Sequence, residues 1–320
     1  DIFVVYGAAN GDLIDAFTRT NKTRYVAVMH EQAGGFAAEA YAKISGKFGV
    51  AIATSGPGAM NFVTPIGNCY YDSVPCLFIT GQVKQKYMRK TTAVRQIGFQ
   101  ESDVTSIVKP ITKYAALITN PIDVRYELEK ALFLMSSGRP GPVLLDIPID
   151  VQKAQINEKA LRGYKQERSP YDVKSVNEGI DRYIKDLLHA QRPVMIVGGG
   201  VRTGNAVKEL LELGRLLKIP IFPTWNALDV VASDYKYYGG RIGTYGGPGR
   251  NFGIQNSDLV LAIGSRLSGR LYGNRADAFL RGAKKYLVDI DEGLVKKENQ
   301  VVPFDVSMLC QAGTFISLLY

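Results

Sequence analysis

The stretch YVAVMHEQAGGFAAEAYAKISGKFGVAIATSGPGAMN, residues 25–61, shows the plainest strand–helix–strand pattern of the chain. Two short apolar runs, at 25–29 and 49–53, flank a longer segment of mostly small residues that we expect to form a packed helix. Strands that are apolar on both faces and separated by helices are typical of parallel βαβ units, because helices cover both faces of the sheet. The stretch therefore predicts a doubly wound parallel sheet.

The same alternation of apolar runs and amphipathic segments extends from Ile2 to Ile147 and resumes after a polar segment. Two consecutive α/β domains, each with a doubly wound parallel sheet, are the simplest account of this pattern. The polar segment contains few large apolar residues and is typical of an inter-domain linker. The predicted limits are 1–150 for the first domain, 151–172 for the linker with the boundary near Ser169-Pro170, and 173–320 for the second domain.

The composition is that of an ordinary globular chain: of the 320 residues, 46% are hydrophobic and 22% are charged. The 39 Lys and Arg residues outnumber the 30 Asp and Glu residues, but they form no run typical of nucleic-acid binding. The three cysteines have no metal-like spacing and favour a reducing compartment, and no apolar run reaches membrane-spanning length. We therefore expect a cytoplasmic protein that binds neither nucleic acid nor membrane. Because the sequence begins inside a strand and ends on apolar residues, we also expect it to be part of a longer polypeptide.

Glu31 comes two residues after the first apolar run of the opening stretch. Its carboxylate could simply interact with the free amides and the dipole at the start of the predicted helix. It also stands at the carboxyl end of a strand, which is where open parallel sheets form their ligand crevices. The position in the fold therefore favours a chemical role for Glu31.

Two further segments of the first half carry the signs of a binding site. In ATSGPGAMN, residues 53–61, glycines on both sides of a proline follow a strand, so the backbone can approach a ligand closely or simply make a tight turn. The segment 80–101 is long, polar and basic, and loops of this length are more often functional than accidental. Its basic side chains could meet an anionic substrate or only water.

The second half has glycines and arginines after its predicted strands. They occur in IVGGGV (196–201), GRIGTYGGPGRN (240–251) and GSRLSGR (264–270). These segments suggest a nucleotide-sized ligand or structural turns, and the first lacks the full GxGxxG spacing and its partner acid. The sequence has no P-loop and no Cys/His metal cluster. It contains only two histidines, so few residues are available for acid–base catalysis by histidine.

Six motifs occur in the order seen in thiamine-diphosphate-dependent enzymes of the acetohydroxyacid (acetolactate) synthase type, and the chain resembles this family over nearly its whole length. The motifs are HEQAGGFAAEAYAKISG, ATSGPGAMN, TGQV, GFQE, GRPGPVLLDIP and IVGGGV. The run AVRQIGFQESDVTSIVKPITKYA is most similar to acetolactate-synthase-like proteins associated with bacterial surface-polysaccharide gene clusters. The resemblance implies a pyrimidine-binding domain up to about residue 150, a central domain from about residue 173, and a third domain outside this sequence. In the family that third domain carries a GDG motif that holds Mg²⁺ and the diphosphate, and the sequence contains no GDG.

The resemblance also implies roles for individual residues. Glu31 matches the acid that hydrogen-bonds the aminopyrimidine ring of thiamine diphosphate, and Gln100 matches a catalytic position that also lines the substrate pocket. Pro57 and Asn61 match positions beside the ring. The other matched positions are Gly7, Ala8, Gln82 and Phe99 at the substrate pocket, and Gly198, Gly199, Gly200 and Arg266 at a cofactor site in the central domain, with no metal ligand in this chain.

The sequence departs from the family pattern at three places. Tyr6-Gly7-Ala8 replaces a Pro-Gly-Gly turn, so a methyl group is added to the pocket wall. Ser268 and Gly269 stand where flavin-binding synthases usually have two acids, which leaves FAD an open option through Gly198–Gly200 and Arg266. No histidine occurs in 82–101, which disfavours a simple decarboxylase that ends by protonating its intermediate.

The resemblance implies a thiamine-diphosphate-dependent transferase or lyase, with Mg²⁺ held by the third domain. The expected reaction is decarboxylation of a 2-oxo acid, most simply pyruvate, followed by carboligation of the two-carbon unit to a second carbonyl. The acceptor stays open between another 2-oxo acid and a sugar ketone. The family's active site lies between subunits, so we expect a homodimer or homotetramer. The alternative is a non-catalytic or regulatory homologue that binds a nucleotide in its second domain.

Overall fold

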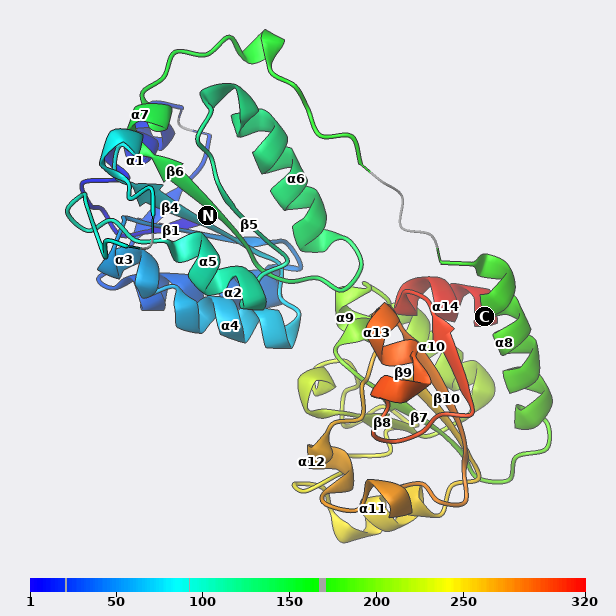
Figure 1. The fold of residues 1–320 in the computed structure, drawn as a ribbon. Coiled ribbons are helices and arrows are strands. Elements are labelled where there is room, and N and C mark those ends of the chain that lie inside the picture. The colour runs from blue at the N-terminus through cyan, green and yellow to red at the C-terminus, as the bar shows by residue number, and fades with distance from the viewer. Residues whose placement is uncertain (21, 92, 167–170) are drawn as a thin grey trace. The chain divides into compact units, whose positions relative to one another are not determined.

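The computed structural model describes residues 1–320 apart from 21, 92 and 167–170 (Figure 1). Contacts divide the chain into two compact units, Asp1–Arg168 and Ser169–Tyr320. Each unit contains one sheet in which all neighbouring strands are parallel, which confirms the predicted fold class of two α/β domains. The predicted boundary at Ser169-Pro170 lies outside the described residues. Within the part of the chain that is described, no helix is long and apolar enough to cross a membrane.

The first unit has a six-stranded sheet in the order β2-β1-β3-β4-β6-β5. Three of its four interior strands, β3, β4 and β6, are buried along their whole length, as expected for strands covered on both faces. The strands are β1 (Ile2–Val4), β2 (Tyr25–Ala27), β3 (Gly49–Ala53), β4 (Cys76–Gln82), β5 (Tyr114–Leu117) and β6 (Val143–Pro148).

Helices cover both faces of this sheet (Figure 1). Because side chains alternate along a strand, Ala51 and Ala53 of β3 pack with α2, α4 and α5, whereas Val50 and Ile52 pack on the opposite face with α1 and α6. The helices are α1 (Gly11–Thr20), α2 (Glu31–Ser45), α3 (Pro57–Met60), α4 (Val63–Asp72), α5 (Val104–Val108), α6 (Val124–Ser136) and α7 (Ile149–Gln152).

The segment predicted as a linker is partly packed on the first unit. The ring of Tyr164 lies 5.5 Å from the ring of Tyr126 and 5.7 Å from that of Phe133, both on α6. Its backbone N–H donates to Glu129 at 2.7 Å, and the guanidinium of Arg162 lies 4.1 Å from the ring of Tyr126. Although the segment is mostly polar, the contacts of Arg162 and Tyr164 therefore hold it on α6 as far as Tyr164.

The second unit has a five-stranded sheet in the order β11-β10-β9-β7-β8. Its larger core cluster lies against α8, α10 and α14, and a second cluster lies on the opposite face of the sheet. The strands are β7 (Pro193–Val197), β8 (Ile221–Pro223), β9 (Leu259–Ile263), β10 (Lys284–Asp289) and β11 (Val306–Leu309). The helices are α8 (Val173–Leu187), α9 (Gly200–Thr203), α10 (Val207–Leu217), α11 (Pro248–Gln255), α12 (Gly269–Tyr272), α13 (Glu292–Val295) and α14 (Ala312–Leu319).

Candidate functional site

The order of strands places a topological switch point between β1 and β3. From β1 the chain passes to β2 on one side, and then to β3 on the other side. Ligands of open α/β sheets bind outside the carboxyl ends of the strands at such a point. The segments that follow β1, β2 and β3 contain Gly7, Glu31 and Pro57, and Gln82 is the last residue of β4. The sheet therefore brings these predicted site residues of the first unit to one edge.

Glu31 is the first residue of α2, and its carboxyl is held from the next βα unit. The Nδ2 atom of Asn61 donates to Glu31 Oε2 at 2.8 Å. The other oxygen, Oε1, lies beside Gly58, where a Cβ atom would come within 3.1 Å of it. His30 caps the start of the helix, because the N–H of Gln32 donates to His30 Nδ1 at 3.2 Å. The structure thus joins Glu31, Asn61 and the short helix α3 that begins at Pro57.

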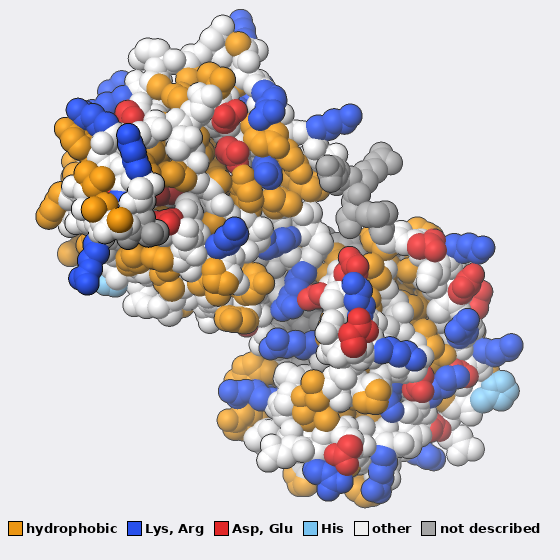
Figure 2. All heavy atoms as spheres, in the orientation of Figure 1, with side chains coloured by type: hydrophobic (Ala, Val, Ile, Leu, Met, Phe, Trp, Pro, Cys, Tyr) orange, Lys and Arg blue, Asp and Glu red, His pale blue; other side chains and the backbone are white. Residues whose placement is uncertain are grey.

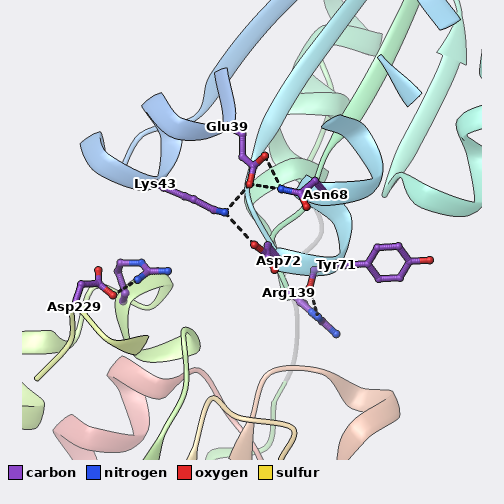
Figure 3. Close-up of polar contacts among 8 residues, drawn as sticks. Glu39, Lys43, Asn68, Tyr71, Asp72, Arg139 and Asp229 are labelled. Atoms are coloured by element: carbon purple, nitrogen blue, oxygen red, sulfur yellow. Dashed lines mark hydrogen bonds and ion pairs between the residues drawn. The ribbon is translucent and has the colours of Figure 1, made fainter. Parts of the chain in front are cut away.

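Glu39, a second acid on the same helix, has a structural role. It is 4% exposed, accepts from Asn68 Nδ2 at 2.8 Å and pairs with Lys43, which also pairs with Asp72 at 3.0 Å (Figure 3). Figure 3 shows Glu39 pointing toward Asn68 and Lys43. A buried acid on α2 that lies away from the switch point provides a matched comparison for Glu31.

The turn after β1 is fixed by Asn10 and Thr54, two residues to which the sequence analysis assigned no role. A Cβ atom on Gly7 would lie 2.5 Å from Thr54 Cβ, so the two strand ends touch at the switch point. The N–H of Gly7 donates to Asn10 Oδ1 at 2.8 Å, and the N–H of Ala9 donates to Thr54 Oγ1 at 3.1 Å. Ala8, the residue that departs from the family pattern, is exposed at this edge.

Gln100 packs directly on the turn that starts α3. It adopts a φ of 62°, in the left-handed region, and Gly56 adopts a φ of 60°. A Cβ atom on Gly56 would lie 2.7 Å from Gln100 O and 2.8 Å from Gln100 Cβ, so this contact requires glycine. The neighbouring Phe99 is 85% exposed. The structure therefore places the predicted pair Phe99 and Gln100 next to the segment that carries Pro57 and Asn61.

Gln82, which the sequence analysis assigned to the substrate pocket, is almost fully buried. Its side chain is buried, with Nε2 donating to Ser102 O at 2.7 Å and to Asp146 Oδ2 at 2.9 Å. Its Oε1 accepts from the N–H of Val83 at 3.0 Å. The side-chain amide therefore makes its hydrogen bonds within the protein, and these connect the end of β4 to β6 and to the loop that precedes α5.

Asp146 is the buried carboxyl at the centre of this arrangement. It is 2% exposed and accepts from Thr80 Oγ1 at 2.7 Å in addition to Gln82. Burial raises the pKa of Asp146 to about 7, although hydrogen bonds from Thr80 and Gln82 lower it; the charge of Asp103 adds to the rise. The sequence showed only an acid within the apolar run PVLLDIP, with no sign of its partners.

The pKa of Asp146 predicts a pH dependence of stability. The folded protein holds the proton of this carboxyl more tightly than the unfolded chain, so its contribution to stability is present at low pH and is lost as the pH rises toward the folded-state pKa of about 7. We expect the free energy of unfolding of the unsubstituted protein, relative to that of Asp146→Asn, to fall by about 1.4 kcal/mol per pH unit between about pH 5 and pH 6, and by about half as much per unit near pH 7. Urea denaturation of both proteins across this range measures the difference.

The control for this pH dependence is Glu129→Gln. The hydrogen bond from Arg125 lowers the pKa of Glu129, so its contribution should not change with pH in the same range. A difference between the unsubstituted protein and Asp146→Asn that is flat across this range would show that Asp146 is ionised in the folded state throughout.

In the second unit the predicted glycine cluster lies at another switch point, between β7 and β9. A Cβ atom on Gly198 would lie 2.0 Å from Gly264 O, and one on Gly200 would lie 2.7 Å from Gly264 Cα. Gly199 is partly exposed, and Arg266 is exposed after β9. Packing between the two strand ends is sufficient to require Gly198, so this glycine does not by itself indicate a ligand.

No group of three or more His, Cys, Asp and Glu side chains that could hold a metal ion occurs among the described residues. The carboxyls of Glu31 and Asp146 each accept hydrogen bonds from protein side chains.

Comparison with known proteins identifies both units. Residues 1–107 match the family described as "Thiamine pyrophosphate enzyme, N-terminal TPP binding domain", and residues 180–319 match "Thiamine pyrophosphate enzyme, central domain". These matches confirm the family predicted from the sequence motifs.

Three relatives show the extent of the similarity. The acetolactate synthase large subunit of Corynebacterium glutamicum is 38% identical over 94% of this chain and 47% of its own length. The acetolactate synthase of Mycobacterium leprae is 37% identical over 93% of this chain and 47% of its own length, and the chloroplastic enzyme of Arabidopsis thaliana is 38% identical over 92% and 43%. The chain spans less than half the length of these relatives. It belongs to the thiamine pyrophosphate enzymes, of which it carries the N-terminal and central domains.

Proposed function

We propose that the complete protein is a thiamine-diphosphate-dependent enzyme of the acetolactate synthase type. It decarboxylates a 2-oxo acid, with pyruvate as the expected donor, and joins the two-carbon unit to a second carbonyl. The observation that carries this proposal is the hydrogen bond between Asn61 and Glu31 at the switch point of the first sheet. The similarity to relatives named acetolactate synthase supports the choice of reaction.

The residues at the first switch point fit the aminopyrimidine ring of thiamine diphosphate. A carboxyl that is partly exposed, with one oxygen held by an amide, suits a ring that offers a basic nitrogen beside an amino group. When bound, thiamine diphosphate supplies a nucleophilic carbon and accepts the electron pair left by decarboxylation. Glu31 exchanges a proton with the ring nitrogen, and Asn61 keeps its carboxyl in place during this exchange. Pro57 borders the ring, and Phe99 and Gln100 face the substrate.

The first unit, with predicted limits 1–150, is proposed as the pyrimidine-binding domain, and the unit from 173 onward as the central domain. A domain outside this sequence would hold Mg²⁺ and the diphosphate. Large apolar side chains are exposed near the first switch point, with Met29 fully exposed, Phe99 85% exposed and Tyr6 74% exposed. Exposed apolar surface of this kind marks an interaction site, which supports an assembly of at least two subunits, as a homodimer or homotetramer.

The second unit is proposed to hold a nucleotide-sized cofactor at the ends of β7 and β9, with FAD as the candidate and Gly198, Gly199, Gly200 and Arg266 as its nearest residues. A flavin absorbance band in the purified full-length protein supports FAD, and a colourless protein that gains no band with added FAD contradicts it. We expect no nucleic-acid partner, since basic side chains in Figure 2 are interspersed with acidic and hydrophobic ones on the face in view. A cytoplasmic location agrees with free, buried Cys69, Cys76 and Cys310.

The test of the proposed function uses the full-length protein, thiamine diphosphate, Mg²⁺ and pyruvate. We expect release of carbon dioxide together with acetolactate, or with a longer product when a sugar ketone is added as acceptor. A protein that binds thiamine diphosphate but consumes no 2-oxo acid with any acceptor would favour the alternative, a non-catalytic homologue. Failure to bind thiamine diphosphate with Mg²⁺ would contradict the proposal outright.

A further inference from the structure

Glu101 closes the long loop that carries Phe99 and Gln100. Its side chain is buried, at 8% exposure, although it belongs to a polar and basic segment. One carboxylate oxygen accepts from the N–H of Arg89 at 2.6 Å, and the other accepts from the N–H of Ile97 at 2.9 Å. Hydrogen bonds from backbone N–H groups to a carboxylate are charge-assisted and stronger than those between neutral groups. A single side chain therefore joins two points of the loop that are eight residues apart in the sequence.

The backbone of Glu101 strengthens the same closure. Its N–H donates to Gly98 O at 3.0 Å, and its carbonyl accepts from Gln96 Nε2 at 2.8 Å. The carbonyl of the next residue, Ser102, accepts from Gln82 Nε2 at 2.7 Å. The base of the loop is thus hydrogen-bonded to the end of β4, and Glu101 connects separate points within the loop.

The hydrogen bonds of Glu101 hold the loop next to a residue with a strained backbone. Gln100, directly before Glu101, has a φ of 62°, which residues with a Cβ atom rarely adopt. Such a conformation persists only when neighbouring contacts hold it in place, and it concentrates at functional sites. Gly56 provides the contact on one side of Gln100, and the four hydrogen bonds of Glu101 provide the contacts on the other.

We propose that Glu101 is a positioning residue of the active site: its carboxylate holds the loop closed so that Phe99 and Gln100 face the substrate. This inference rests on the proposed function. Glu101 acts through the loop, because its hydrogen bonds go to Arg89, Ile97, Gly98 and Gln96 and not to Glu31 or Asn61. Loss of the carboxylate should therefore disturb the substrate side of the site while leaving the aminopyrimidine contacts in place.

The test is Glu101→Gln in the full-length protein. Glutamine keeps the size of the side chain, but its NH₂ group must face one of the two backbone N–H groups, so one hydrogen bond is replaced by a repulsive contact. We expect amide hydrogen exchange of the loop peptide that contains Arg89 and Ile97 to accelerate about tenfold or more. We expect kcat for carboligation to fall about tenfold, with the affinity for thiamine diphosphate within about twofold of the unsubstituted protein.

Glu39→Gln is the matched control, because Glu39 is a buried carboxyl of the same unit with partners outside the loop. It should leave exchange in the loop unchanged. Gln96→Ala serves as a milder second variant, since it removes one hydrogen bond to Glu101 O from an exposed side chain. It should accelerate exchange in the same peptide by a smaller factor, and it keeps the test decisive if Glu101→Gln does not fold.

Unchanged loop exchange in both Glu101→Gln and Gln96→Ala would overturn the proposal. A fall in affinity for thiamine diphosphate in step with kcat would also overturn it, because Glu101 would then support the whole unit rather than the loop. An unsubstituted protein that forms no carboligation product contradicts the proposed function instead; loop exchange in the variants then decides independently whether Glu101 closes the loop.

Discussion

Replacing Glu31 with glutamine is expected to lower the rate of carboligation by the full-length protein about a hundredfold or more, because a positioned proton-transfer group contributes rate factors of this size. Glutamine preserves the size of the side chain and can still accept the hydrogen bond that Asn61 donates at 2.8 Å. It cannot exchange a proton with the cofactor ring. The initial rate of product formation from pyruvate, at saturating thiamine diphosphate and Mg²⁺, measures the effect.

Glu39→Gln controls for the loss of a carboxylate from α2. Because Glu39 is buried against Asn68 and Lys43, this variant should lose stability, since breaking a buried ion pair leaves a partner uncompensated. At a temperature where it remains folded, its rate should stay within a few-fold of the unsubstituted protein. Equal rates for Glu31→Gln and Glu39→Gln would remove the basis for the role assigned to Glu31.

Replacing Gly56 with alanine is expected to lower the free energy of unfolding by about 3 kcal/mol or more. Gly56 combines a φ of 60° with a ψ of −127°, a conformation that essentially only glycine adopts. The added Cβ atom would also lie 2.7 Å from Gln100 O. Relief of this clash must move either α3 or the loop that carries Phe99 and Gln100, so kcat should fall as well. Urea denaturation and steady-state kinetics measure the two effects.

Gly138→Ala separates the clash from backbone strain. Gly138 also has a positive φ, of 56°, but a Cβ atom there would meet nothing within 4 Å. Its replacement should cost about 1–2 kcal/mol, from the left-handed conformation alone, and should leave kcat unchanged. If Gly56→Ala were no more destabilising than Gly138→Ala, the packing of Gln100 on Gly56 would be of no consequence.

The fold could be predicted from the sequence because apolar strand runs and helices alternate in both halves. The start of α2 at Glu31 and of α3 at Pro57 follows from the same pattern, since each helix begins four residues after the last residue of a strand. Because β2 and β3 lie on either side of β1, the segments that follow them meet at the switch point and bring Glu31 and Asn61 together. These are the parts of the site in which local sequence and sheet topology agree.

The roles of Gln82, Glu101 and Asp146 could not be predicted, because their partners are distant in sequence or belong to the backbone. Every residue of β4 is buried, so the pattern of its side chains does not reveal which way Gln82 points. Glu101 binds two backbone N–H groups, and no residue type signals such a contact. An acid in a loop or at a strand end has the same appearance in the sequence whether it binds a ligand or holds the protein together.

The glycines of the second unit show the same limit. Gly198 is required by the backbone of Gly264, which lies far along the chain and meets it only through the pairing of β7 with β9. A glycine that admits a phosphate and a glycine that admits another backbone cannot be distinguished from a single sequence. The anchor at Tyr164 was concealed for a related reason, since its aromatic partners belong to α6.

The most direct test of the central claim is the rate of deuterium exchange at the reactive carbon of thiamine diphosphate bound, with Mg²⁺, to the full-length protein. Proton control by Glu31 predicts rapid exchange in the unsubstituted protein and in Glu39→Gln, and exchange slower by about a hundredfold or more in Glu31→Gln. Equally rapid exchange in Glu31→Gln, with the cofactor bound, would contradict the account.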